Sequence, residues 1–416
     1  MTSRPSRPAA RILVTLLLCC PQTSLGQWQL VNVRVVDGLG GHIEHGWIEI
    51  DQGHIAALGS GEPPSPTPTQ IDGDGATAMP GFIDTHRHLF AYQGFRSDRS
   101  LQRYIRRKLP DLLTRLLTAG FTTIVSPGDH VPEIFEIRDR LANGDLQGPR
   151  LIASGGMLSA PGDHPAPTLC RGNRYCQGKL AVAIGNATHA RDAVRNLVSA
   201  RADMIKLVHD RELHPRIVID DIVVQAVIDE ARAQQVPLIA HTRTASDFAF
   251  LTQLGVARIV HTPIIGSLAE HTEQLRGLEA TLVVQSTLSW LSPEVSARRR
   301  GADRADRLRQ ALLNLRTLQT HRIPIAFGTD NPWPLADDAF MPEVRLLADV
   351  LDNNAVISAM THTAARFLYL DSEIGALEPG MRADIVLLDG NPLEDLQALE
   401  QVVRVIQAGH VVTTHP

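Results

Sequence analysis

The chain has 416 residues, a length that suits one large domain with a smaller one attached. Hydrophobic residues make up 44% of it, charged residues 20%, and the formal net charge is -5, which is ordinary for a globular protein. No long basic run is present, so we expect no nucleic-acid partner.

The first 26 residues have the pattern of a secretory signal peptide. Arginines precede the short apolar run at residues 12–18, and small residues surround a cleavage point before Gln27. The run is too short to cross a bilayer, and no other segment resembles a membrane span. We expect residues 1–26 to be removed. The mature protein would then be secreted or periplasmic and would have no membrane contact.

Both ends of the mature chain carry short alternating strands. Residues 28–36, 47–51 and 54–59 have this pattern, and it returns at residues 383–388 and 402–406. No crossover helix links these strands, so they cannot easily join a parallel barrel. We expect residues 27–79 and 369–416 to form one small composite β-sandwich domain.

Between these ends, short apolar runs alternate with helical patterns, including apolar stripes in residues 112–117 and 222–227. This alternation predicts an α/β fold, a (β/α)8 TIM-like barrel, over residues 80–368. Residues 155–186 are rich in Gly, Pro and polar residues and are expected to form a long loop that shapes a substrate pocket. The expected strands lie at residues 77–84, 121–126, 150–154, 203–208, 236–241, 258–261, 281–285 and 324–328.

Two of the four cysteines, Cys170 and Cys176, remain after signal removal, because Cys19 and Cys20 lie within residues 1–26. An oxidising compartment and a short polar loop predict a local disulfide between Cys170 and Cys176. Metal binding by this pair is the alternative, although no Cys or His nearby completes a tetrahedral set.

Histidines, a lysine and an aspartate stand at or just after the ends of these runs. His86 and His88 follow the first run, and in an extended segment alternate side chains point to one side. Neutral imidazole is well suited to zinc. Each residue alone could be an ordinary polar group, but the carboxyl ends of barrel strands carry the chemistry. We therefore expect convergence of His86, His88, Lys206, His241, His261 and Asp330.

These residues and their surroundings resemble the amidohydrolase superfamily of metal-dependent hydrolases. The resemblance rests on Pro80-Gly81-Phe82-Ile83-Asp84-Thr85-His86-Arg87-His88, on Asp203-Met204-Ile205-Lys206, on His241 and His261, on Gly328-Thr329-Asp330, and on residues 361–366 and 375–386. It is closest to the imidazolonepropionase-like branch, which includes bacterial Xaa-Pro dipeptidases. It implies a barrel with a composite β domain.

The resemblance also implies a site with two divalent metal ions, expected to be Zn²⁺. His86, His88 and Asp330 would hold one ion, and His241 and His261 the other. Lys206 would bridge both after carbon dioxide converts it to N6-carboxylysine, because a bare ammonium has no acceptor. Asp330 would also be catalytic. It would take a proton from the water that bridges the two ions, which leaves hydroxide, and pass this proton to the leaving nitrogen.

The expected activity is hydrolysis of an amide bond in a small molecule, either a dipeptide or an N-acyl amino acid. Deaminases of this superfamily generally carry a Glu shortly after the His of strand five, but Thr242 to Ser246 follow His241 here. A cyclic-amide hydrolase or deaminase of the same fold is the alternative, and a non-catalytic binding barrel is a further one. The sequence leaves the oligomeric state open, and a homo-oligomer is one possibility.

Three further residues are candidates for substrate binding. His164 lies on the loop after strand three, where the family often places a substrate-contacting His, and solvent exposure is the alternative. Arg243 could bind a substrate carboxylate as a bidentate fork or serve as a structural ion-pair partner. His209, three residues after Lys206, is another candidate for the pocket.

Overall fold

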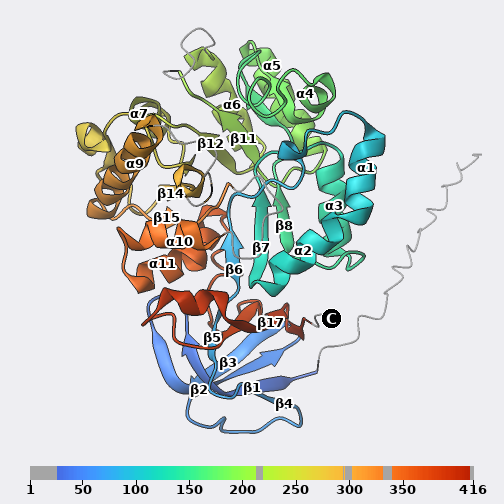
Figure 1. The fold of residues 1–416 in the computed structure, drawn as a ribbon, viewed down its shortest axis with the longest axis vertical. Coiled ribbons are helices and arrows are strands. Elements are labelled where there is room, and N and C mark those ends of the chain that lie inside the picture. The colour runs from blue at the N-terminus through green and yellow to red at the C-terminus, as the bar shows by residue number, and fades with distance from the viewer. Residues whose placement is uncertain (1–25, 212–218, 294, 296–301, 331–339, 413–416) are drawn as a thin grey trace, which may run out of the picture.

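The computed structural model describes residues 26–211, 219–293, 295, 302–330 and 340–412. The signal peptide expected at residues 1–26 therefore lies almost entirely outside the described residues. Figure 1 shows a barrel of strands and helices with a separate sheet below it, to which both ends of the chain contribute. In the described part of the chain, no helix is long and apolar enough to cross a membrane.

The separate sheet has eight strands in the order β18-β17-β16-β5-β1-β2-β3, with β4 paired to β1. β5 joins the two ends of the chain, because it pairs in parallel with β1 and antiparallel with β16. This pairing confirms a composite β domain, although its hydrogen bonds form one continuous sheet. Its strands are β1 (Trp28–Val36), β2 (His42–Asp51), β3 (His54–Ser60), β4 (Gln70–Asp72), β5 (Thr77–Pro80), β16 (Ile385–Leu388), β17 (Val402–Gln407) and β18 (His410–Val411).

The barrel strands follow one another in parallel and confirm the predicted fold class. Hydrogen bonds from Asp203 N to Ala153 O (2.9 Å) and from Thr85 N to Phe327 O (3.2 Å) join its two hydrogen-bonded sheets. The strands are β6 (Phe82–Asp84), β7 (Phe121–Ser126), β8 (Arg150–Ala153), β11 (Ile205–Val208), β12 (Leu238–His241), β13 (Arg258–Val260), β14 (Val283–Gln285) and β15 (Ile325–Ala326).

Helices surround the barrel strands and bury apolar faces against them, as Figure 1 shows. They are α1 (Asp98–Arg107), α2 (Leu109–Thr118), α3 (Glu133–Ala142), α4 (Arg174–Leu180), α5 (Ala187–Ser199), α6 (Asp221–Ala233), α7 (Ala245–Gln253), α8 (Thr272–Leu275), α9 (Ala302–Thr320), α10 (Met341–Ala348), α11 (Asn353–Met360) and α12 (His362–Phe367). Short 3₁₀ helices are η1 (Ala91–Gln93), η2 (Leu268–His271), η3 (Ser289–Leu291) and η4 (Leu396–Glu400).

The structure corrects three local predictions. The strand expected at residues 77–84 is two strands, because the chain leaves the sheet for the barrel at Gly81, where a Cβ atom would collide with Thr122. The loop expected at residues 155–186 contains β9 (Met157–Ser159), β10 (Ala181–Ala183) and α4. The apolar stripe in residues 222–227 is wrong at Ile222, which is 70% exposed, since the buried face of α6 starts one residue later.

Candidate metal centre

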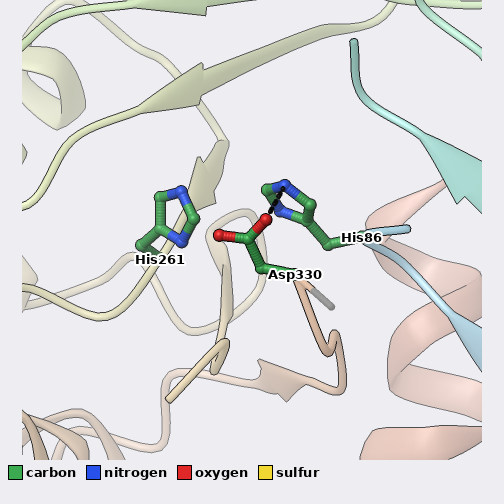
Figure 2. A group of neighbouring side chains, drawn as sticks. All are labelled: His86, His261 and Asp330. Atoms are coloured by element: carbon green, nitrogen blue, oxygen red, sulfur yellow. Dashed lines mark ion pairs between the residues drawn. The ribbon is translucent and has the colours of Figure 1, made fainter. Parts of the chain in front are cut away.

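The residues expected to bind metal come from five barrel strands, and all but Lys206 lie at or beyond the carboxyl end of their strand. His86 and His88 follow β6, Lys206 lies within β11, His241 ends β12, His261 follows β13, and Asp330 lies four residues beyond β15. The ligand atoms of His86, His261 and Asp330 all lie within 4.8 Å of one another. Figure 2 shows the Asp330 carboxylate between the two imidazoles, with one oxygen directed at His86 and the other turned toward His261.

His86, His88 and Asp330 form a tight cluster around one carboxylate oxygen. Asp330 Oδ1 lies 3.3 Å from His86 Nε2 and 3.5 Å from His88 Nε2, and the two Nε2 atoms are 3.3 Å apart. Both imidazoles are buried. Burial lowers the pKa of His88 to about 3 and lowers the pKa of His86 well below its usual range, so both rings are neutral. Neutral rings have a free lone pair, which metal binding requires.

Hydrogen bonds fix which nitrogen of each ring carries the proton. His88 Nδ1 donates to the carbonyl oxygen of Gly128 at 2.6 Å, and His86 Nδ1 donates to Gln285 Oε1 at 3.0 Å. The amide nitrogen of Gln285 donates to Thr85 O, which orients Oε1 toward His86. The Nε2 atoms of His86 and His88 therefore face the centre without protons, as expected for ligands held by outer hydrogen bonds.

His241 and His261 form a second pair beside the first. Their ring centroids are 4.5 Å apart, and the His261 ring is 5.1 Å from that of His86. His261 Nδ1 lies 2.6 Å from the hydroxyl oxygen of Thr287, which leaves Nε2 for a metal. His241 instead donates from Nε2 to Asp210 at 2.8 Å, so Nδ1 is its candidate ligand atom. The hydrogen bond to Asp210 thus makes Nδ1 the candidate ligand atom of His241, whereas Nε2 is the candidate ligand atom of the other three histidines.

Lys206 provides the strongest test of whether a metal bridge fits here. Its side chain is 1% exposed, and its Nζ atom has no hydrogen-bond partner in the part of the chain that the structure describes. Burial lowers its pKa to about 7, so a large fraction of the amine is neutral at neutral pH. Reaction with carbon dioxide requires this neutral amine. A buried, unpartnered amine among histidines therefore fits a carbamate bridge between cations.

Asp330 combines backbone and side-chain constraints. Its backbone has a left-handed φ of 47° and donates from N to His86 O at 2.9 Å. Its Oδ1 accepts a hydrogen bond from the Tyr92 hydroxyl at 3.2 Å. Burial raises the pKa of Asp330 to about 7, the first condition for a group that exchanges protons near neutral pH.

Buried carboxylates outside this cluster hold the strand ends in place. Asp84 accepts from the backbone N of His86 and from both N and Oγ1 of Thr329, at 2.7 to 3.0 Å, so it ties β6 to the segment before Asp330. Asp210 is buried and accepts from His241 and from Arg243. The sequence interpretation singled out neither these residues nor Tyr92 and Gln285. No local pattern marks them, although the position of Asp210 just after β11 is one weak signal.

The structure separates the three candidates for substrate binding. His164 stacks on His241, with ring centroids 5.1 Å apart and planes at 19°, so it lies at the metal centre. Arg243 donates from Nε to Asp210 Oδ2 at 3.0 Å, which is the ion pair of the structural alternative, and its side chain is partly exposed. His209 faces away, stacked on Phe250 of α7 at 5.2 Å and 3.6 Å from Asp247.

Cys170 and Cys176 are joined by a disulfide. Cys176 lies on α4, and both cysteines are buried against Met157 and Val208. Their sulfur atoms are therefore bonded to each other, in place of the metal binding that was the alternative. The bridge lies in the loop segment that also carries His164.

Comparison with solved structures agrees with this fold. The putative prolidase from Bifidobacterium longum is 25% identical to this chain and covers 94% of it and 95% of its own length, with a TM-score of 0.76. A Xaa-Pro dipeptidase with bound methionine in its active site has a TM-score of 0.79 at 21% identity, over 94% of this chain and all of that one (100%).

Two curated relatives have a different activity, because both are deaminases. A 5-methylthioadenosine/S-adenosylhomocysteine deaminase from Halalkalibacterium halodurans is 25% identical over 89% of this chain and 87% of its own length. An adenine deaminase from Shewanella halifaxensis is 40% identical over 65 residues, but this stretch is only 16% of this chain and 11% of that protein.

The sequence profile described as "Amidohydrolase family" matches residues 77–412, from the strand that joins both ends of the chain to the last strand of the sheet. This family generally uses divalent metals, and the clustered histidines and aspartate provide a candidate site for them. The chain therefore belongs to the amidohydrolase family, and it is a hydrolase that acts on carbon–nitrogen bonds.

Proposed function

We propose that this protein is a binuclear metal-dependent amidohydrolase that cleaves dipeptides or N-acyl amino acids. The observation that carries the proposal is the Lys206 amine, buried without a hydrogen-bond partner among the described residues and surrounded by metal-ligand side chains. An unmodified amine in this position would be costly, whereas a carbamate would supply two anionic oxygens to a pair of cations.

The residues divide into two ligand sets with one shared bridge. His86, His88 and Asp330 are positioned to hold one ion, and His241 and His261 the other, with carboxylated Lys206 between them. The bound ions, proposed to be zinc, would supply Lewis acidity toward the scissile carbonyl and would acidify water. The remaining chemistry belongs to the side chains of the chain.

Asp330 is the proposed proton carrier. Its carboxylate lies where both ligand sets meet, and its raised pKa of about 7 allows it to accept a proton from water and release it later. The proton would go to the nitrogen of the cleaved bond, so that the amine leaves as a neutral group. His164, stacked on His241, is positioned to contact the bound substrate.

Two observations support peptide-like substrates. Several similar structures are described as prolidases or as a Xaa-Pro dipeptidase. In addition, the segment directly after β12, where a deaminase would be expected to carry a glutamate, contains Arg243, which pairs with Asp210 from the segment after β11. The guanidinium of Arg243 binds Asp210 through Nε and is still partly exposed, so it can also meet a substrate carboxylate.

Deamination is the second candidate, because a curated relative of nearly full length is a deaminase. Product analysis separates the two activities: a free amino acid indicates amide hydrolysis, and ammonia indicates deamination. The decisive assay is a panel of dipeptides, N-acyl amino acids and aminopurine nucleosides with zinc or manganese added. We expect an amino acid product, and ammonia release from the nucleosides alone would contradict the proposal.

The lysine bridge has its own test. Lys206→Ala should lose nearly all activity and bind metal poorly, and a small carboxylic acid such as acetate or propionate should restore part of both. Lys206→Ala occupies no more space than the natural side chain, so a stable variant is expected. Full activity without added acid would contradict the bridging role.

The cellular location is also part of the proposal. The signal-like residues 1–26 and the disulfide between Cys170 and Cys176 both fit a secreted or periplasmic protein. N-terminal sequencing of the protein from its native host should find Gln27 as the first residue. A mature protein that still begins at Met1 in the cytoplasm would contradict export.

A further inference from the structure

Tyr92 lies beside the metal-site carboxylate but has no part in the chemistry described above. Its hydroxyl donates to Asp330 Oδ1 at 3.2 Å, the oxygen that lies 3.3 Å from His86 Nε2 and 3.5 Å from His88 Nε2. Its ring packs edge-on against the His88 ring, with centroids 5.2 Å apart and planes at 75°. Tyr92 therefore contacts two of the proposed metal ligands.

The turn that carries Tyr92 is held rigidly. Tyr92 lies in η1, the next element after β6, and the backbone amides of Leu89, Phe90 and Ala91 all donate to the carboxylate of Asp129 at 2.7 Å. Asp129 is fully buried and accepts a further hydrogen bond from the Ser126 hydroxyl at 2.8 Å. The backbone of the turn that carries Tyr92 is thus held in place without any contact to Asp330.

The two oxygens of Asp330 have different surroundings. Oδ1 faces His86, His88 and the Tyr92 hydroxyl. Figure 2 shows the other oxygen turned toward His261, on the side of the second ligand pair. The two oxygens of a carboxylate rotate together, because they are bonded to the same carbon. A hydrogen bond to one oxygen therefore restricts rotation of the whole group.

We propose that Tyr92 is a positioning residue whose hydroxyl fixes the Asp330 carboxylate, with Oδ1 toward His86 and His88 and Oδ2 free to accept the proton. This inference rests on the proposed function for the role of Oδ2. Loss of the hydroxyl would let the carboxylate rotate. Rotation would weaken metal binding and slow proton transfer, with little effect on how the substrate binds.

The test compares Tyr92→Phe with Tyr104→Phe. Both variants lose one hydroxyl, but the buried Tyr104 hydroxyl has no hydrogen-bond partner among the described residues, and the Tyr104 ring packs on Phe90 and Phe95, neither of which is a proposed ligand. Three quantities are measured: zinc affinity by competition with a chromophoric chelator, kcat and KM on the best substrate, and the temperature of unfolding.

We expect Tyr92→Phe to unfold like the wild type, to bind zinc about 10-fold more weakly and to lose about 10-fold to 100-fold in kcat, with KM nearly unchanged. Tyr104→Phe should match the wild type in zinc affinity and kcat. If Tyr92→Phe does not fold, Tyr92→Leu removes the same hydroxyl and keeps an apolar contact with His88.

Two results would overturn the inference. One is a Tyr92 variant with wild-type zinc affinity and kcat, and the other is a raised KM at unchanged kcat, which would place Tyr92 in substrate binding. The zinc titration needs no substrate. A wild-type protein that binds zinc but cleaves no amide would therefore defeat the proposed function alone, and the affinity difference would still decide the role of Tyr92.

Discussion

At the scale of single residues, the centre depends on proton positions that are set from outside it. Gly128 and Gln285 hold the protons of His88 and His86 on Nδ1, whereas Asp210 holds the proton of His241 on Nε2. Burial keeps the rings of His86 and His88 neutral, and the hydrogen bonds orient all three rings before any ion arrives. Metal binding needs little reorganisation when the ligand lone pairs are already in place.

Asp210→Asn should therefore weaken zinc binding by about 10-fold to 100-fold, because an amide holds the Nε2 proton of His241 less firmly than a carboxylate does. Asp247→Asn is a matched control: Asp247 is also a buried carboxylate that accepts from an arginine, Arg211, but it touches no proposed ligand. Chelator competition measures the affinity. Equal losses in both variants would show that general destabilisation is responsible.

His130 gives a prediction for pH dependence. It is fully buried, its ring nitrogens have no hydrogen-bond partner among the described residues, and aromatic rings of Phe90, Phe95 and Tyr175 surround it. Burial lowers its pKa to about 4. In the unfolded chain a histidine titrates near pH 6.5, so between pH 6.5 and 4 the unfolded state binds more protons. The stability of the folded protein must fall as the pH drops through that window.

His130→Phe should remove this sensitivity. In metal-free protein, the wild type should lose about 2 kcal/mol more unfolding free energy than the variant between pH 7.5 and pH 5, at about 1.4 kcal/mol per pH unit below 6.5. Urea unfolding at both pH values provides the measurement. If both proteins lose stability in parallel, His130 is not the group responsible.

At the scale of elements, side-chain hydrogen bonds join two segments at the mouth of the barrel. Asn173 donates from its side chain to Phe95 O at 2.6 Å, and the Tyr175 hydroxyl donates to Asp98 at 2.8 Å. These contacts tie the segment around α4 to the segment that follows η1. The disulfide between Cys170 and Cys176 holds the start of α4 in position for both contacts.

Removal of the bridge, in Cys170→Ser/Cys176→Ser, should loosen this region locally. A loop this short is worth about 2 kcal/mol in unfolded-state entropy, so a modest fall in melting temperature is expected. Hydrogen exchange should speed up in residues 89–98 and 165–183 and stay unchanged in the sheet of β1 to β3. Uniformly faster exchange across the whole protein would contradict a local role.

At the scale of the whole molecule, local patterns in the sequence predicted the barrel and the residues that form the candidate metal centre. His86, His88 and Asp330 are chemically distinctive, and each follows an apolar run that reads as a strand. The partners that orient them were not predictable in this way. Gln285 and Asp330 reach their partners His86 and Tyr92 across 199 and 238 residues, and only the closed barrel brings these side chains together.

The boundary between the β domain and the barrel also could not be predicted from local sequence patterns. Residues 77–84 look like one strand, because every residue of β5 and β6 is buried and apolar character alone cannot mark where a strand changes sheets. The change occurs at Gly81, whose N donates to Asp384 O at 2.9 Å in the sheet while Phe82 N donates to Gly120 O in the barrel. Only long-range pairing reveals it.

The most direct test of this account is the metal content of active protein measured together with its amide-hydrolysing activity. Elemental analysis of the purified wild type should find close to two divalent ions per chain, and removal of metal by a chelator should abolish activity until zinc or manganese is restored. Full activity in protein that contains no metal would contradict the proposed centre.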